Sequence, residues 1–213
     1  MKTIAIGDIH GCYDNLIALF DLMKDKGYYS GKERVIFLGD YIDRGKNPRK
    51  VVEFVRQLQE KNPNVIALKG NHEDMMIKHY DGNRQSGLLY NGYDATIRSY
   101  KGHSKQFRND REWIRNLPIY YEDDYYIYVH AGVNPYIETM KEQDEETMLW
   151  ARYEFINDYQ KYYKTVIFGH TPYSFSPYMT VAGNICLDSG CVFGGSLTAL
   201  VIENGERKSY ISI

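Results

Sequence analysis

The stretch Thr3-Ile4-Ala5-Ile6-Gly7-Asp8-Ile9-His10-Gly11 contains the pattern that decides the fold. Its first four residues are typical of a buried strand, and the run ends at a glycine followed by polar residues. Asp8 and His10 stand two residues apart, so at an extended strand end both side chains can point the same way. The flanking glycines allow the backbone to approach a ligand closely. This stretch therefore predicts a strand that presents the first two ligands of a metal site.

The same arrangement recurs along the chain, where four further strand-like runs each stop at a small or polar cluster. These runs are Arg34 to Leu38, Asn64 to Leu68, Tyr125 to Val129 and Thr165 to Phe168. Helical patterns at residues 15–26 and 48–60 separate the first three strands, and Pro48 stands where a first helical turn is expected. This is βαβαβ alternation, and right-handed crossovers place such strand ends on one edge of a sheet.

The remaining segments predict a mixed α/β (α+β) fold. The tail, residues 184–213, has strand patterns and tight turns without a helix, including Asn204-Gly205, and we expect a second sheet there. Residues 73–117 are polar and mostly helical in pattern, and we expect a helical lobe beside the site.

The composition disfavours several classes of protein. The net charge of −2 and the pI near 6.3, without clustered basic residues, argue against a nucleic-acid partner. The three cysteines lack CxxC spacing and support neither a disulfide framework nor a thiolate zinc site. No apolar stretch approaches the roughly 18 residues of a membrane span. We therefore expect one catalytic domain over residues 1–213, located in the cytoplasm and without membrane association.

The strand ends supply six oxygen and nitrogen ligand candidates, namely Asp8, His10, Asp40, Asn71, His130 and His170. A lone strand-end aspartate is usually a turn former, and a lone histidine is usually a hydrogen-bonded structural residue. Six such residues at successive strand ends instead predict a site for two divalent cations, because a carboxylate such as that of Asp40 can bridge two ions. The set without sulfur suits manganese, with iron or zinc as alternatives. His79 and His103 lack this context, and we expect structural roles for them.

These ligand candidates lie within ordered motifs: GDIHG (7–11), GDYIDRG (39–45), GNHE (70–73), HAG (130–132) and FGH (168–170). The motifs resemble the metallophosphoesterases of the phosphoprotein phosphatase group, which includes bacterial serine/threonine phosphatases and symmetrical diadenosine tetraphosphatases. The resemblance spans residues 6–195 and implies a four-layer sandwich of two facing mixed sheets flanked by helices. It also implies that one metal is held by Asp8, His10 and Asp40, and the other by Asp40, Asn71, His130 and His170.

One departure from the broader superfamily narrows this expectation. Many members carry a second histidine two residues after the last ligand, whereas this chain reads Gly169-His170-Thr171-Pro172. Proline offers no ligand atom, so we expect the first ion to have three protein ligands plus water. This pattern resembles the phosphoprotein phosphatases and disfavours polynucleotide nucleases and cyclic-nucleotide phosphodiesterases.

Two arginines are candidates for binding the phosphoryl group. The planar guanidinium groups of Arg44 and Arg152 suit bidentate contacts with phosphoryl oxygens. Arg44 belongs to GDYIDRG, whereas Arg152 matches the family's second phosphate-binding arginine more loosely. A surface ion pair with Glu154 or Asp158 is the alternative role for Arg152.

The resemblance implies a proton donor as well. His72, next to the ligand Asn71, is expected to protonate the leaving group while Asp43 orients its ring and stabilises its charged form. Glu73 is expected to be a helix-start residue rather than a catalyst.

The expected activity is phosphoester hydrolysis by a hydroxide bound between two metal ions. We expect a serine/threonine protein phosphatase acting on a phosphorylated protein, because the short lobe leaves little material for a pocket around two nucleosides. A symmetrical bis(5'-nucleosyl)-tetraphosphatase acting on a dinucleoside polyphosphate is the alternative, since tyrosine rings could stack on adenine. The candidate rings are Tyr41, Tyr90, Tyr93, Tyr136 and Tyr173. An inactive binding module is disfavoured because all six ligands and His72 are present.

Overall fold

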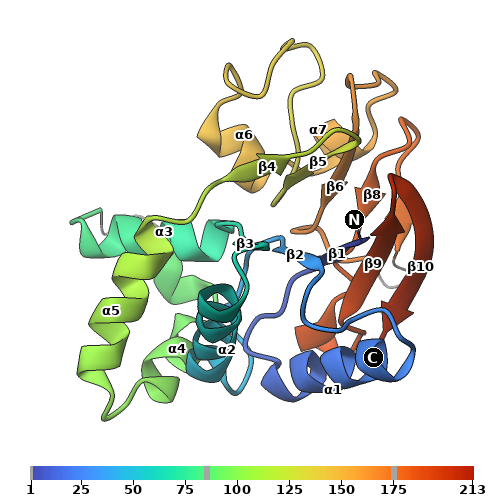
Figure 1. The fold of residues 1–213 in the computed structure, drawn as a ribbon. Helices are drawn as coiled ribbons and strands as arrows, with labels where there is room; N and C mark the ends of the chain where they lie inside the picture. Colours follow the sequence, from blue (N-terminus) through green and yellow to red (C-terminus); the bar gives the residue numbers. More distant parts are fainter. Residues whose placement is uncertain (1, 84–86, 174–176) are drawn as a thin grey trace.

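Two five-stranded mixed sheets form the centre of the computed structural model, which describes residues 2–83, 87–173 and 177–213 (Figure 1). The first sheet has the order β10-β9-β1-β2-β3, with β1 Lys2–Ile6, β2 Arg34–Phe37, β3 Val65–Ala67, β9 Thr198–Glu203 and β10 Glu206–Ser212. The second has the order β4-β5-β6-β8-β7, with β4 Tyr120–Glu122, β5 Tyr126–Val129, β6 Thr165–Phe168, β7 Tyr178–Met179 and β8 Ile185–Cys186.

Helices surround these sheets. Those of the described residues are α1 Tyr13–Asp25, α2 Pro48–Lys61, α3 Asn71–Tyr80, α4 Tyr93–Ser99, α5 Ser104–Arg115, α6 Glu145–Trp150 and α7 Tyr153–Ile156, with 3-10 turns η1 Leu88–Tyr90 and η2 Cys191–Phe193. Within the described parts of the chain, no helix combines the length and apolar character needed to cross a bilayer.

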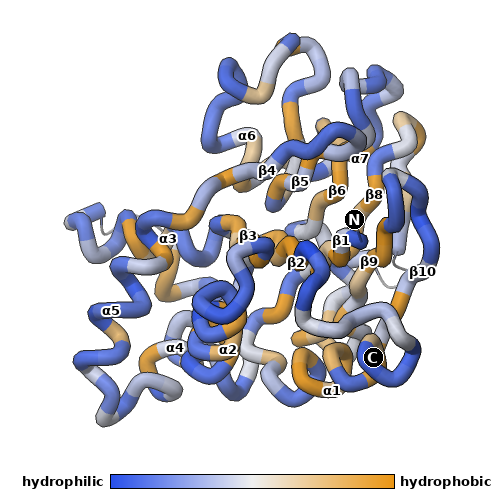
Figure 2. Tube along the Cα trace, in the orientation of Figure 1, coloured by the Kyte–Doolittle hydropathy of each residue, from blue (hydrophilic) through white to orange (hydrophobic). Residues whose placement is uncertain are grey.

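The inner strands are apolar on both faces because each sheet lies between helices and the other sheet. On β1, Ile4 packs in the cluster that contains residues of α1 and α2, whereas Ala5 lies in the core between the sheets. On β6, Phe168 packs in the cluster that contains residues of α6 and α7, whereas Ile167 lies between the sheets. Figure 2 shows hydrophobic residues concentrated in the central strands. These layers confirm the predicted sandwich of two mixed sheets flanked by helices.

The predicted βαβαβ alternation forms the first sheet. Strands β1, β2 and β3 are parallel neighbours, with Ile4 paired to Val35 and Val35 paired to Val65. Strands β5 and β6 are parallel neighbours in the second sheet, where Ile127 pairs with Val166. The predicted ligands therefore arrive from the ends of parallel strands in two facing sheets.

The tail differs from the expectation of a separate second sheet. Only β8 joins the second sheet, whereas β9 and β10 extend the first one, and β9 runs antiparallel to β1 with Leu200 opposite Ala5. The physical reason is that β2 covers only one edge of β1, and β9 supplies the hydrogen bonds for the other edge. Leu200 also lies in the core between the sheets, where it adds apolar contact.

Helices α3, α4 and α5 occupy most of the segment predicted as a lobe, of which residues 84–86 lie outside the described residues. Helix α3 contacts α5, and α4 contacts α2. Because α3 begins at Asn71, the predicted ligand Asn71 and the predicted acid His72 both lie on its first turn.

The buried Glu73 carboxylate joins the start of α3 to the loop after β2. It accepts hydrogen bonds from the backbone N–H groups of Asp40 (2.8 Å), Tyr41 (2.9 Å) and Ile42 (3.2 Å). It also accepts one from Gly70 (3.0 Å) at the N-terminus of its own helix. Glu73 is thus the expected helix-start residue, and it additionally fixes the loop that carries Asp40.

We predict that Glu73→Gln destabilises the protein by about 2 to 4 kcal/mol, because both oxygens of Glu73 accept buried N–H groups, whereas the NH₂ group of glutamine accepts none. Thermal unfolding should shift downward by roughly 4 to 16 °C. Glu146→Gln, at an exposed position of α6, is the matched control and should leave the transition unchanged. Equal unfolding curves for the two variants would contradict the anchoring role of Glu73.

Candidate dimetal centre

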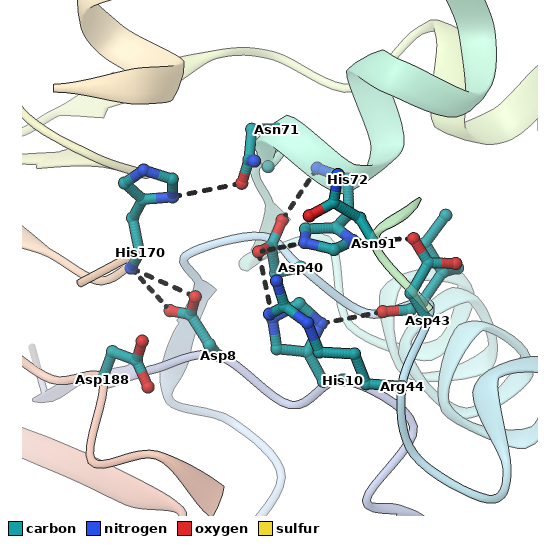
Figure 3. A network of polar contacts seen from close by, with 12 residues as sticks. Asp8, His10, Asp40, Asp43, Arg44, Asn71, His72, Asn91, His170 and Asp188 are labelled. Carbon is teal, nitrogen blue, oxygen red and sulfur yellow. Dashed lines mark hydrogen bonds and ion pairs between the residues drawn. The ribbon is translucent and has the colours of Figure 1, made fainter. Parts of the chain in front are cut away.

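Three predicted ligands adopt backbone conformations that non-glycine residues seldom adopt. His10, Asp40 and His170 have positive φ values of 44°, 54° and 66°. Such conformations are costly and persist only where the surrounding structure enforces them, which is common at functional sites. Here the strand ends enforce them, and Figure 3 shows the side chains turned toward a common centre.

One half of the centre gathers Asn71, His130 and His170. His130 Nδ1 lies 2.8 Å from the Leu38 carbonyl oxygen and donates its proton there, so Nε2 presents a lone pair. This Nε2 lies 2.9 Å from Asn71 Oδ1 and 3.2 Å from His170 Nδ1, and the latter two atoms are 3.1 Å apart. Asp40 Oδ1 lies 3.6 Å from the same His130 Nε2.

Electrostatics keep these imidazoles neutral. Burial lowers the pKa of His130 and, with the help of His130 and Arg152, lowers the pKa of His170 to about 2. The buried Nε2 of His170 has no hydrogen-bond partner within the described residues. Neutral imidazole rings, an amide oxygen and a carboxylate therefore lie close together, and this set of nitrogen and oxygen atoms fits a divalent cation.

The other half centres on His10. Its Nδ1 lies 2.9 Å from the Ile42 carbonyl oxygen, so Nε2 faces the centre, where it lies 3.2 Å from Asp40 Oδ2. Asp40 thus presents one oxygen to each half, as expected of a bridging carboxylate. Arg44 Nη1 lies 2.5 Å from His10 Nε2, where it supplies positive charge.

Asp8 is oriented from the second sheet. Both of its carboxylate oxygens lie 3.1 Å from the backbone nitrogen of His170, which donates to them. A Cβ atom on Gly169 would lie 2.0 Å from Asp8 Oδ1, so this approach requires glycine. Burial, together with the carboxylates of Asp188 and Asp40, raises the pKa of Asp8 well above its usual range. Such a group of buried carboxylates fits a cation, which would favour their ionised forms.

The predicted proton donor has its predicted partner. His72 Nδ1 lies 2.6 Å from Asp43 Oδ2, and the hydroxyl of Thr96 on α4 donates to the other Asp43 oxygen at 2.6 Å. Thr96 Oγ1 in turn accepts the Asp43 backbone N–H at 2.9 Å. His72 Nε2 is left facing the centre, 3.9 Å from Asp40 Oδ2.

The two arginines lie on opposite halves of the centre. Arg44 approaches His10, whereas Arg152 Nη1 lies 3.4 Å from both the His170 carbonyl oxygen and Thr171 Oγ1. Among the described residues, the Arg152 side chain forms no ion pair with Glu154 or Asp158. Glu154 instead accepts the Arg152 backbone N–H at 2.9 Å. The phosphate-binding role of Arg152 stays a prediction.

Asp188 and Thr96 also contact the site residues but were not predicted from the sequence. Asp188 follows β8 in Leu187-Asp188-Ser189-Gly190, so the rule that polar residues follow buried strands could have found it. Burial raises its pKa, and Figure 3 places it beside Asp8. Thr96 lies in the middle of a helix and gives no local signal of its contact with Asp43.

Two of the proposed stacking tyrosines cannot contact a base. Tyr41 is buried and donates to the Leu68 carbonyl oxygen, and Tyr93 is buried with its hydroxyl against that of Tyr80. Tyr90 and Tyr136 are exposed, and the ring of Tyr173 stacks on Tyr178 with centroids 4.4 Å apart.

The chain belongs to the calcineurin-like phosphoesterase family, whose model matches residues 1–203. It is 28% identical to the asymmetrical bis(5'-nucleosyl)-tetraphosphatase PrpE of Oceanobacillus iheyensis, with 100% of this chain and 93% of that protein covered. It is 26% identical to the protein of the same name from Anoxybacillus flavithermus, with 96% and 91% covered.

Solved structures share the fold. A cold-active protein-tyrosine phosphatase from a psychrophilic Shewanella species superposes with a TM-score of 0.70 at 19% identity, covering 99% of this chain and 80% of that one. A protein serine/threonine phosphatase from Saccharomyces cerevisiae, similar to human PP5, gives a TM-score of 0.65 at 15% identity, with 100% and 79% covered.

These comparisons confirm the predicted resemblance and the class of enzyme. The protein is a metallophosphoesterase and a hydrolase, and its family binds a dimetal centre. The tetraphosphatase relatives carry the asymmetrical designation, whereas the alternative derived from the sequence was the symmetrical enzyme.

We predict that Asp40→Asn abolishes turnover and removes at least one metal equivalent, because the bridge loses charge where two cations need it. Metal content after desalting should be measured by mass spectrometry. Asp124→Asn, at an exposed loop position, is the matched control and should retain both metals. Two full equivalents with normal turnover in Asp40→Asn would refute the bridging role.

We predict that His72→Asn retains the metals but slows hydrolysis of a phosphoserine peptide by about 10²- to 10⁴-fold, the usual range for general acid catalysis. The loss should be smaller for p-nitrophenyl phosphate, whose leaving group needs little protonation. The measurement is kcat for both substrates at saturating metal. An equal loss for the two leaving groups would show that His72 is not the acid.

Proposed function

We propose that this protein hydrolyses dinucleoside tetraphosphates asymmetrically, releasing a nucleoside monophosphate and a nucleoside triphosphate. The observation that carries the proposal is similarity over essentially the whole chain to relatives named for this activity. The alignment covers 100% and 96% of this chain for the two relatives, including the segments between the ligand motifs. Loops in such segments commonly determine which substrate a shared scaffold accepts.

The placement of the positive charges supports a polyphosphate substrate. Arg44 lies at the His10 half of the centre and Arg152 at the His170 half, so positive charge flanks both predicted metal positions. A chain of four phosphates carries negative charge over a longer distance than a single phosphoryl group. It can therefore contact both guanidinium groups and both metal positions at once.

In the proposed reaction a water oxygen bonds to the phosphorus nearest one nucleoside. The bond from that phosphorus to the oxygen shared with the next phosphate breaks, the nucleoside triphosphate leaves with the electron pair, and the attacking water releases a proton to solvent. Two divalent cations held by the six ligands would supply Lewis acidity that activates water and the phosphoryl group. Arg44 and Arg152 bind phosphoryl oxygens, and His72 donates a proton from Nε2 to the departing oxygen while Asp43 holds its Nδ1.

A phosphoprotein is the second candidate substrate. The observation that favours it is the buried pair of His72 and Asp43, because a serine alkoxide needs protonation more than a triphosphate does. Hydrolysis of phosphoserine or phosphothreonine would use the same ligands and arginines. We rank it second because the full-length relatives are named for dinucleoside tetraphosphates.

We predict that diadenosine tetraphosphate yields ATP and AMP, with kcat/KM at least about tenfold above that for phosphoserine and phosphothreonine peptides. Products should be separated by ion-exchange chromatography after incubation with manganese, and with iron or zinc in parallel. Two molecules of ADP would establish symmetrical cleavage instead. A preference for phosphopeptides would replace the proposal by the protein phosphatase alternative.

A further inference from the structure

The turn after β8 places an exposed aromatic ring at the edge of the centre. Phe193 is 65% exposed and ends the 3-10 turn η2. Gly190 and Gly194, which flank this turn, have φ values of 68° and 88°, which favour glycine. Single exposed apolar residues are common, so exposure alone would not assign a role to Phe193.

This turn is attached to the centre at its base. The Gly190 N–H donates to Asp188 Oδ1 at 3.0 Å, and Asp188 is the buried carboxylate beside Asp8. The Phe193 N–H donates to the Gly190 carbonyl oxygen at 2.9 Å. Ser189 Oγ donates to the Ser196 carbonyl oxygen at 2.8 Å and closes the base of the turn. The ring therefore has a defined position relative to the predicted metal site.

The ring also contacts a predicted phosphate-binding group. The guanidinium carbon of Arg44 lies 5.4 Å from the Phe193 ring centroid, within the range of a cation–π contact. Nη1 of the same guanidinium lies 2.5 Å from His10 Nε2. Arg44 thus lies between a flat aromatic surface and the centre, so a phosphoryl group bound by Arg44 would have the Phe193 ring nearby.

We propose that Phe193 stacks on the base of the nucleotide whose phosphorus is attacked. This inference rests on the proposed function. It assigns the recognition of the nucleoside base to a residue outside the ligand motifs. In the proposed asymmetrical cleavage the reacting phosphorus is the one attached to the nucleoside, whereas in symmetrical cleavage one phosphate would lie between the nucleoside and the reacting phosphorus. A ring in contact with Arg44 suits the shorter spacing. Stacking on a phenyl ring tolerates every base, so discrimination among bases should be weak.

A second exposed ring offers a direct comparison. Trp150, at the end of α6, is 37% exposed and presents its ring edge-on to His170, with centroids 6.0 Å apart and planes at 81°. It lies at the half of the centre that Arg152 approaches, so the two rings mark different positions for a base. The Phe193 ring contacts a guanidinium face-on, whereas Trp150 contacts a predicted metal ligand.

The test compares AMP with ribose 5-phosphate as inhibitors of p-nitrophenyl phosphate hydrolysis by the manganese-loaded protein. The two inhibitors differ only in the base, so the ratio of their inhibition constants reports base binding whatever a variant does to turnover. In the wild type AMP should bind about 5- to 100-fold more tightly. Phe193→Ala should bring the ratio close to one, and Phe193→Trp should restore it.

Tyr159→Ala, at an exposed aromatic position, is the matched control and should keep the wild-type ratio. The proposal is overturned if the wild type does not prefer AMP, if Phe193→Ala keeps the ratio, or if Trp150→Ala alone removes it.

Hydrolysis of diadenosine tetraphosphate is measured in a separate assay. A base preference that depends on Phe193 without tetraphosphate cleavage would reject the proposed function while retaining a nucleotide site. Cleavage with an unchanged ratio in Phe193→Ala would reject only the role of Phe193.

Discussion

The arrangement of the centre depends on one buried carboxylate that is not among its predicted ligands. Glu73 accepts backbone N–H groups from the loop after β2 and from the start of α3, so Asp40 and Asn71 are fixed relative to each other. Burial and the nearby Asp40 carboxylate raise the pKa of Glu73 to about 8, and the hydrogen bonds from Gly70 and the loop oppose this shift. A cation bound to Asp40 would neutralise its carboxylate and so weaken the repulsion between Asp40 and Glu73. Metal binding and the anchoring of the loop therefore favour each other.

In the rest of the site, too, the fold holds together groups that repel one another. Burial and the neighbouring carboxylates of Asp188 and Asp40 raise the pKa of Asp8, and polar atoms of His130, His170 and Asn71 gather within hydrogen-bond distance of one another. Positive φ values at His10, Asp40 and His170 add backbone strain. Two packed sheets and the hydrogen bonds to Glu73 maintain this arrangement, so cations find their ligands already positioned.

Local patterns in the sequence identified the strands of the fold and the ligand residues at the strand ends. Apolar runs followed by polar residues predicted β1, β2, β3, β5 and β6, and the structure brings the residues at their ends together. Contacts between residues that are distant in sequence produce no local pattern, so they were not predicted. Thr96 reaches Asp43 from another helix, and β9 pairs with β1 from the far end of the chain. Tyr41 illustrates the same limit, because only the packed structure shows that its ring is buried.

Substrate choice lies in residues that the shared motifs do not include. A dimetal centre with a proton donor and two arginines can act on a phosphomonoester or on a phosphoric anhydride, because the attacked group is a phosphoryl group in both. The motifs therefore favoured a protein phosphatase and a tetraphosphatase alike. What differs between these substrates is the group attached to the reacting phosphorus. Under the stacking role that we propose, such a group would extend toward Phe193, on the segment after β8, and Trp150 is a second exposed ring near the centre, at the end of α6. Variation in these two segments can change the substrate while the ligands and the Glu73 contacts stay the same.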